Sequence, residues 1–168
     1  MQIRIAGMEP ESVVDGPGYR FSIFTQGCPH GCPKCHNPET HDFLGGYTMD
    51  TAEIIAQLGE NPLVRGVTLS GGEPMMQAAA LCEIASAARE KGMSVWCYTG
   101  FTLEALENEN REDRMALLAL VDVLVDGPYI AARRSLDLLY RGSDNQRLID
   151  MQATRRAGKI CLYEPPQW

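Results

Sequence analysis

The sequence predicts an α/β fold in which a mostly parallel sheet forms an open, partial (β/α)6-type barrel. Apolar runs with the length of buried strands alternate with segments whose apolar residues recur at helical spacing. Strands that alternate with helices pair in parallel through right-handed βαβ units. A complete eight-fold barrel needs about 250 residues. The 168 residues of this chain suffice for about five or six units, so we expect the barrel to stay open at one side.

The first predicted strand covers residues 21–27 and runs into a loop rich in glycine and proline. Asp50 followed by Glu53 matches an N-cap with a carboxylate three residues later, which predicts the start of a helix. An apolar stripe follows, and Gly59 and Pro62 end that helix.

Two further strand–helix pairs follow. Residues 64–70 form a short apolar run that leads into Gly71-Gly72-Glu73-Pro74, and the helix after it stops at Gly92. Residues 93–98 predict the next strand, which leads into Thr99-Gly100.

The remaining elements follow the same alternation. A helix is expected to start near Thr102, and the polar residues 107–114 predict a solvated break to which we assign no function. Residues 115–120 are helical in pattern, and residues 121–125 form a strand that ends in Asp126-Gly127-Pro128.

Each of four predicted strands is thus followed by glycine, proline or reactive polar residues. The four groups are 28–35, 71–74, 99–100 and 126–128. The carboxyl ends of parallel strands lie at one edge of a sheet, where such folds place their sites. Taken alone, the second and fourth groups are ordinary tight turns. Together, the four groups predict one site.

Size and composition predict a single globular domain over residues 1–168, since 45% of the residues are hydrophobic and 22% are charged. The net charge of −7 argues against nucleic acid as a partner, which needs a basic footprint. No apolar run approaches the roughly 18 residues that cross a bilayer. The N-terminus is too short and polar for a secretory signal. We expect a cytoplasmic protein without a membrane partner.

Cys28, Cys32 and Cys35 carry the strongest chemical signal. A C-x3-C-x2-C loop without a fourth cysteine nearby offers three thiolates where a cubane iron–sulfur cluster commonly binds four. One iron would then stay open for a ligand that is not protein. Zinc is the alternative, because it also prefers thiolate and imidazole ligands. Three histidines lie in or near the loop, at His30, His36 and His41. The spacing alone favours neither metal.

The other cysteines are Cys82, Cys97 and Cys161, which lie far apart in apolar contexts and are predicted to be buried, inert thiols. They supply no second ligand pair of the kind that structural zinc sites use. A disulfide framework is also disfavoured, because a chain of this size builds an ordinary core.

The Gly71-to-Pro74 segment suggests a ligand of its own. A carboxylate such as Glu73 suits an ammonium group, and backbone donors suit a carboxylate. A ligand with an amino acid moiety could therefore bridge this turn and the open iron.

These features together resemble the radical S-adenosylmethionine enzymes. Within that superfamily, the segment from Asp15 to Arg20 that leads into the cysteine loop is similar to the activases of glycyl radical enzymes. Segments 96–100, 123–128 and 141–147 resemble the activating proteins of anaerobic (class III) ribonucleotide reductases. The resemblance covers residues 12 to about 150, which we take as the core of the single activase domain.

The resemblance implies that Cys28, Cys32 and Cys35 hold one 4Fe-4S cluster and that S-adenosylmethionine binds its fourth iron through the amino and carboxylate groups. No catalytic residue beyond the cluster and the cofactor is implied. Because no general base is needed, His30 and His41 are expected to be loop or surface residues.

The cofactor-binding residues that the resemblance implies fall into two groups. Gly71, Gly72 and Glu73 would contact the amino group of the cofactor, and Pro74 would shape the turn. A second group of candidates is Lys34 and His36 near the nucleoside, and Thr99 and Asp126 for contacts to the cofactor or a cation. The superfamily commonly carries an aromatic residue where this chain has Lys34.

The implied reaction is reductive cleavage of S-adenosylmethionine to methionine and a 5′-deoxyadenosyl radical, which takes the α-hydrogen of a glycine in a partner protein. The expected partner is the large subunit of the anaerobic ribonucleotide reductase, and the expected electron donor is of the flavodoxin type. Three alternatives stay open: an activase of the pyruvate formate-lyase type, a small-molecule radical enzyme such as the deazaguanine-forming synthase, and a non-enzymatic zinc-knuckle module.

Overall fold

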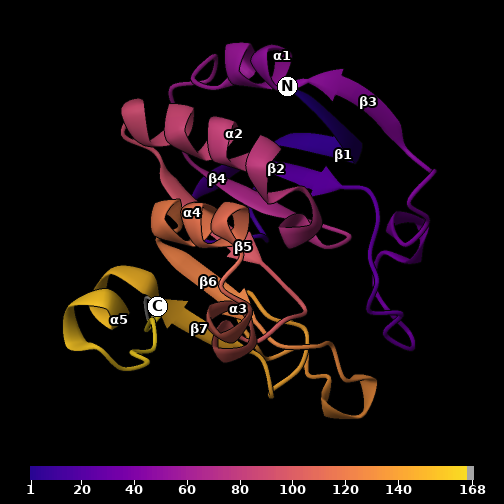
Figure 1. Cartoon of the computed structure of the whole chain (residues 1–168), viewed down its shortest axis with the longest axis vertical. Coiled ribbons are helices and arrows are strands. Elements are labelled where there is room, and N and C mark those ends of the chain that lie inside the picture. Colours follow the sequence, from indigo (N-terminus) through magenta and orange to yellow (C-terminus); the bar gives the residue numbers. More distant parts are fainter. Residues whose placement is uncertain (166–168) are drawn as a thin grey trace.

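The computed structural model describes residues 1–165 and contains one seven-stranded sheet (Figure 1). The strands are β1 (Gln2–Ser12), β2 (Tyr19–Thr25), β3 (Tyr47–Asp50), β4 (Val64–Gly71), β5 (Ser94–Tyr98), β6 (Val123–Asp126) and β7 (Arg147–Asp150). Their order in the sheet is β3-β1-β2-β4-β5-β6-β7. The last three residues of the domain expected for 1–168 lie outside the described part of the chain.

Five α-helices connect or flank these strands in the described residues: α1 (Thr51–Gln57), α2 (Ala78–Glu90), α3 (Leu103–Glu109), α4 (Glu112–Leu120) and α5 (Met151–Ala157). Three short 3-10 helices accompany them: η1 (Pro38–Thr40), η2 (Pro74–Gln77) and η3 (Ala131–Arg133). Within residues 1–165, no helix is both long and apolar enough to cross a bilayer.

The predicted open α/β fold with a mostly parallel central sheet is confirmed. The pairs β2–β4, β4–β5 and β5–β6 are parallel. Antiparallel strands extend this centre on both sides, because β1 pairs with β2, β3 pairs with β1, and β7 pairs with β6. The strands β3 and β7 are the two edges of the sheet, so the sheet stays open.

Most predicted boundaries also hold. Asp50 and Glu53 form the expected capping box at the start of α1, Thr102 caps α3, and Gly92 follows α2 with a left-handed φ of 75°. The break expected over 107–114 is wrong in extent. The helix α3 ends at Glu109 and α4 starts at Glu112, so only two residues separate them.

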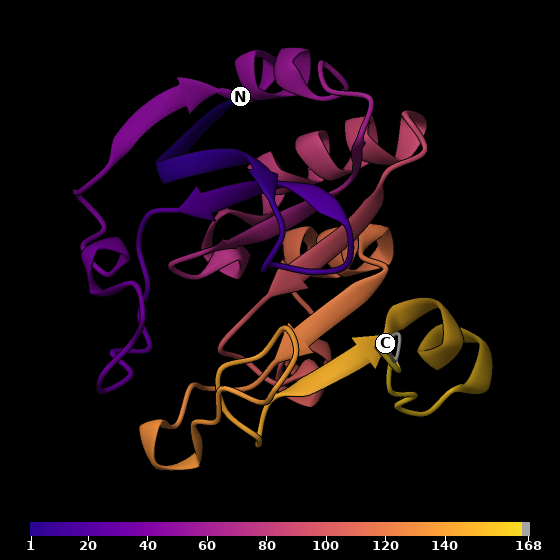
Figure 2. The same ribbon diagram turned by 180° about the vertical axis from the view of Figure 1, so that it is seen from behind.

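The two faces of the sheet differ in character. One face packs against α1, α2 and α4 (Figure 1) and forms the main apolar core. Val95 and Cys97 of β5 point into this core, whereas Trp96 belongs to a smaller cluster on the other face, with Val125 and Tyr140. Figure 2 shows the molecule from that side. In both views, the β2–β3 and β6–β7 connections extend from the same end of the sheet.

The three isolated cysteines are not equally buried. Cys97 is fully buried, and burial raises the pKa of its thiol well above the ordinary value. Burial also raises the pKa of Cys82, which packs against the main core. The expectation of a buried, inert thiol therefore holds for Cys97, whereas Cys82 and Cys161 are only partly buried.

Arg20 is the largest charged group buried in the second face, with an exposed fraction of 1%. Its guanidinium donates hydrogen bonds to the Thr68 and Ser94 hydroxyls and to the Val67 and Ser94 carbonyls, at 2.8 to 3.1 Å. It also lies 5.5 Å from the centre of the Trp96 ring. Burial lowers the pKa of Arg20 to about 10. The guanidinium of Arg20 thus links β2, β4 and β5 by hydrogen bonds.

We expect Arg20→Lys to lower the free energy of unfolding by about 2 to 3 kcal/mol, because an ammonium group cannot reach all the acceptors that the planar fork serves. Urea unfolding monitored by circular dichroism measures the change. Arg89→Lys is the control, since Arg89 is 38% exposed in its ion pair with Asp122, and it should cost less than about 0.5 kcal/mol. Equal effects of the two substitutions would contradict this role of Arg20.

Candidate iron–sulfur and cofactor site

A cavity of about 360 Å³ lies at the carboxyl ends of the parallel strands. Members of all four sequence groups line it, which confirms that the groups meet. These lining residues are Cys28, Cys32 and Cys35, then Gly71 and Gly72, then Thr99 and Gly100, and finally Gly127. Asp15 and residues of the β6–β7 connection complete the wall.

The three predicted metal-binding thiols are free and partly exposed around this cavity. The cysteine loop (Cys28 to Cys35) turns sharply at Gly31 and Lys34, which have φ angles of 58° and 57°. The Cys35 amide donates to the Cys32 carbonyl, and the Asn37 amide donates to Cys35 Sγ at 3.5 Å. Amide hydrogen bonds to thiolate sulfur are common around iron–sulfur clusters.

The chemistry of this donor set fits a cluster with one open iron. Burial raises the pKa of the Cys28 thiol, as do the negative charges of Glu73, Cys32 and Cys35. Thiolates gathered in this way repel one another, and bound iron would offset that repulsion. Within the described residues, no three His, Cys, Asp or Glu side chains are arranged to hold a single metal ion.

The Gly-Gly-Glu turn (Gly71, Gly72 and Glu73) holds the start of the cysteine loop. The Gly72 amide donates to the Thr25 carbonyl at 2.8 Å, and the Glu73 amide donates to the Gly27 carbonyl at 2.9 Å. Gly71 has a φ of 99°, and a Cβ there would overlap the Thr25 amide. A Cβ at Gly72 would lie 2.5 Å from the Gly27 oxygen. The two glycines are therefore required by the close approach of two backbone segments.

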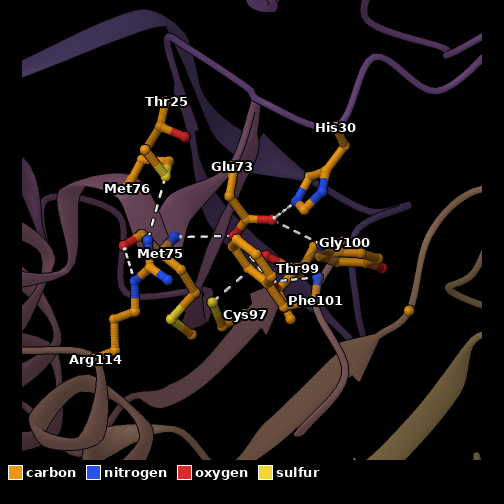
Figure 3. Close-up of polar contacts among 12 residues, drawn as sticks. Thr25, His30, Glu73, Met75, Met76, Cys97, Thr99, Gly100, Phe101 and Arg114 are labelled. Carbon is orange, nitrogen blue, oxygen red and sulfur yellow. Dashed lines mark hydrogen bonds and ion pairs between the residues drawn. The ribbon is translucent and has the colours of Figure 1, made fainter. Parts of the chain in front are cut away.

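The carboxylate of Glu73 is completely buried and fully hydrogen-bonded. Its Oε1 accepts from the Met75 amide at 3.0 Å and the Thr99 hydroxyl at 2.8 Å. Its Oε2 accepts from the Gly100 amide at 2.8 Å and from His30 Nε2 at 2.6 Å. Figure 3 shows these donors converging on the carboxylate from three different loops. The expected contact with the amino group of a cofactor stays a prediction.

Of the other candidate residues, some line the cavity and some do not. Thr99 lines the cavity and bonds to Glu73, and His36 lines it with its ring 4.7 Å from that of Tyr129. Lys34 is exposed and is not among the lining residues, nor is the buried Pro74, which begins η2.

Asp126 is a structural residue in this geometry. Its carboxylate accepts from the Leu103 amide at 2.8 Å and from Arg147 Nε at 2.9 Å. Arg147 also pairs with Glu104, and both partners raise the pKa of Arg147. Asp126 is 1% exposed and absent from the cavity lining. The expected contact of Asp126 with the cofactor or a cation stays a prediction.

His30 lies in a loop, as expected. Its side chain is nevertheless only 17% exposed and reaches the buried Glu73 carboxylate. The cysteine spacing contains no signal for this contact. His41 lines the cavity, and its backbone carbonyl accepts from the Cys28 amide.

Arg114 supports the site from behind, although its segment was expected to be a solvated break. It is 3% exposed, and its Nε donates to the Met75 carbonyl at 2.9 Å. Its guanidinium lies 4.9 Å from the centre of the Phe101 ring (Figure 3). The arginine thereby connects α4 to the two loops that position Glu73. No periodicity in the sequence distinguishes it from an exposed helical arginine.

The comparisons with known proteins agree with this geometry. A family described as a 4Fe-4S single cluster domain matches residues 14–149. The fold and site thus define a protein that binds one iron–sulfur cluster, as the resemblance of the cysteine loop implies.

Curated relatives specify the family further. The anaerobic ribonucleoside-triphosphate reductase-activating protein of Vibrio cholerae is 37% identical over 145 residues, which cover 82% of this chain and 91% of the relative. The proteins of the same name from Haemophilus influenzae and Escherichia coli K12 are each 32% identical to this chain. The alignments cover 82% of this chain, 91% of the first relative and 92% of the second. This chain belongs to the family of anaerobic ribonucleoside-triphosphate reductase-activating proteins.

Solved structures match this chain as well. The crystal structure of QueE from Escherichia coli aligns with a TM-score of 0.49 and 23% sequence identity, over 61% of this chain and 54% of QueE.

We expect Gly71→Ala to destabilise the protein by about 2 to 5 kcal/mol, because it combines a strained φ with a backbone overlap. The control is Gly92→Ala, which has a left-handed φ of 75° but open space around the added Cβ, and should cost about 1 to 2 kcal/mol. Thermal unfolding measures both, and iron analysis after anaerobic reconstitution should show lower cluster content only for Gly71→Ala. Equal destabilisation by both would contradict the packing of the turn against the cysteine loop.

Proposed function

We propose that this protein activates an anaerobic ribonucleoside-triphosphate reductase by forming a glycyl radical on it at the expense of S-adenosylmethionine. One observation carries the proposal: in a member of this family, the three cluster thiols share one cavity with Gly71 and Gly72 of the Gly-Gly-Glu turn, and Glu73 is buried directly behind them. A ligand bound there can contact the open iron and the turn at the same time.

The cysteines and glycines that line the cavity would have different roles in this reaction. A bound 4Fe-4S cluster would supply the electron for reductive cleavage of S-adenosylmethionine, and this chemistry would remove a hydrogen atom from the target glycine. Cys28, Cys32 and Cys35 would hold three of the four irons. Gly71 and Gly72 present backbone to the cavity without side chains in the way, so a cofactor can approach closely.

The cavity wall would hold the rest of the cofactor. We place the amino group of the cofactor near the Gly-Gly-Glu turn, where Glu73 supplies a negative charge. Pro74 is buried and would shape the turn. His36 stands at the wall that would face the nucleoside. Lys34 is exposed and outside the cavity lining, so its contact with the nucleoside stays a prediction. No general base is assigned, because hydrogen-atom transfer needs none.

The glycine would enter from the open side of the cavity. Val14 and Asp15 line it on one side, and Tyr129, Leu138 and Arg141 line it on the β6–β7 side. Residues 1–168 are proposed to act as one activase domain. The reductase as partner follows from the family, whereas a flavodoxin-type electron donor and a cytoplasmic location stay predictions from the sequence.

The decisive test supplies the anaerobically reconstituted protein with reductant, S-adenosylmethionine and the reductase. We expect a doublet glycyl radical signal in electron paramagnetic resonance, together with methionine and 5′-deoxyadenosine. Cys32→Ala should abolish cluster, products and signal, whereas Cys161→Ala, outside the cavity lining, should retain all three. Turnover of a small molecule without the doublet would contradict the proposal, as would a colourless protein containing zinc. A doublet on pyruvate formate-lyase alone would change the partner.

Glu73→Gln tests the cofactor side of the site. We expect the cluster to be retained and the affinity for S-adenosylmethionine to fall by about tenfold to a hundredfold, because a charged hydrogen-bond acceptor is lost. Equilibrium binding under anaerobic conditions measures the change. Asp122→Asn is the control, since it neutralises a largely buried carboxylate outside the cavity lining; it should lower stability but not affinity. Unchanged affinity in Glu73→Gln would remove the turn from the cofactor site.

A further inference from the structure

His30 lies inside the cysteine loop, between Cys28 and Cys32, but its side chain turns away from solvent. The Nε2 atom lies 2.6 Å from Glu73 Oε2, and the imidazole packs edge-on against Phe101 with ring centres 4.6 Å apart. Because this carboxylate accepts N–H or O–H hydrogen bonds from its other partners, the imidazole donates to it. Figure 3 shows the ring reaching Glu73 from the opposite side to the Met75 amide.

This hydrogen bond has no substitute in the described structure. The start of the cysteine loop is held by backbone bonds of Gly27 and Cys28 to the Gly-Gly-Glu turn and the η1 segment. From residue 29 to residue 36, the other hydrogen bonds recorded within 1–165 stay inside the segment or reach Asn37 next to it. Within residues 1–165, the imidazole is thus the only hydrogen-bonding link between this stretch and the turn that follows β4. A contact of an imidazole N–H with a buried carboxylate is stronger than a neutral hydrogen bond.

The loop after β5 is shaped to receive the ring. A Cβ at Gly100 would lie 2.5 Å from His30 Cδ2 and 2.6 Å from His30 Nε2, and the three nearest atoms all belong to His30. Gly100 is not among the residues with positive φ. Its missing side chain therefore makes space for the imidazole rather than relieving the backbone. The Gly100 amide also donates to the same Oε2 atom.

From these contacts we infer that His30 is a positioning residue that sets the distance between the cluster and the cofactor-binding turn. A cofactor that binds an iron and the Gly-Gly-Glu turn together needs both at a fixed separation, and small displacements in such sites are costly. His30 fixes that separation by fastening the middle of the cysteine loop to Glu73. The inference rests on the proposed function for the identity of the cofactor.

The test compares four variants with the wild-type protein: His30→Ala, His30→Gln, Gly100→Ala and the double variant His30→Ala/Gly100→Ala. Glu39→Ala is the control, because Glu39 is exposed in the same connection and outside the cavity lining. Each protein is reconstituted anaerobically. Iron content, affinity for S-adenosylmethionine, and amide hydrogen exchange of residues 29–36 are measured, the last also in cluster-free protein.

His30→Ala should keep its iron but bind S-adenosylmethionine about tenfold or more weakly, within the range typical of coupling between sites. Amide exchange in residues 29–36 should become faster, whereas exchange in α2 and α4 should not change. His30→Gln should recover part of the affinity, because its amide can donate to Glu73. Glu39→Ala should behave as wild type. A general loss of stability would accelerate exchange everywhere and would not be rescued by glutamine.

The double variant isolates the pairing of His30 with Gly100. Gly100→Ala alone should weaken binding about as much as His30→Ala, because the added methyl group displaces the ring. In the His30→Ala background it should add less than about twofold, since the space is then empty; this is the non-additivity expected for residues in contact. Fully additive effects of the two substitutions would overturn the inference.

Failure of the inference and failure of the proposed function give different results. If the wild-type protein binds no S-adenosylmethionine, the proposed function is wrong, while exchange in the cluster-free protein still tests the link to Glu73. If the wild-type protein binds the cofactor and His30→Ala binds it equally well with unchanged exchange, His30 does not position the loop.

Discussion

The site depends on one buried carboxylate. Glu73 has no solvent-exposed surface, and a buried charge is costly unless hydrogen bonds replace its lost hydration. Each of its two oxygens accepts from two donors, which come from the cysteine loop, the turn after β4 and the loop after β5. Because removal of a donor would leave a buried charge undersatisfied, the three loops hold one another in place.

The parallel sheet makes that arrangement possible. Thr25 and Gly71 pair at the ends of β2 and β4, so their loops leave the sheet side by side, and the Gly-Gly-Glu turn can bond directly to the start of the cysteine loop. The other buried charges serve the scaffold. Arg20 is satisfied by hydroxyls and carbonyls, and Asp126 by an amide and Arg147. The buried charges of Arg20 and Asp126 are therefore satisfied within the scaffold, whereas the three cysteine thiols line the cavity.

Local patterns were sufficient to predict the central strands, the helix caps and the four groups at one edge of the sheet, because each depends on neighbouring residues. They could not predict β1, β3 and β7, which are defined by their pairing partners. The pairing of Asp126 with Arg147 could not be predicted for the same reason, since Arg147 lies far along the chain. His30 and Arg114 were missed because histidine in a loop and arginine in a helix are usually exposed, and only tertiary contacts bury them.

The electrostatics of the cavity explain why these groups belong together. The pKa of the Cys28 thiol is raised by burial and by the charges of Glu73, Cys32 and Cys35, so this thiol ionises less readily than an isolated one. Iron offsets the thiolate charges, and an ammonium group bound at the turn would do the same for Glu73. Iron at the thiols and a positively charged group at the turn would therefore both reduce the negative charge around Cys28, which favours a site that binds the two together.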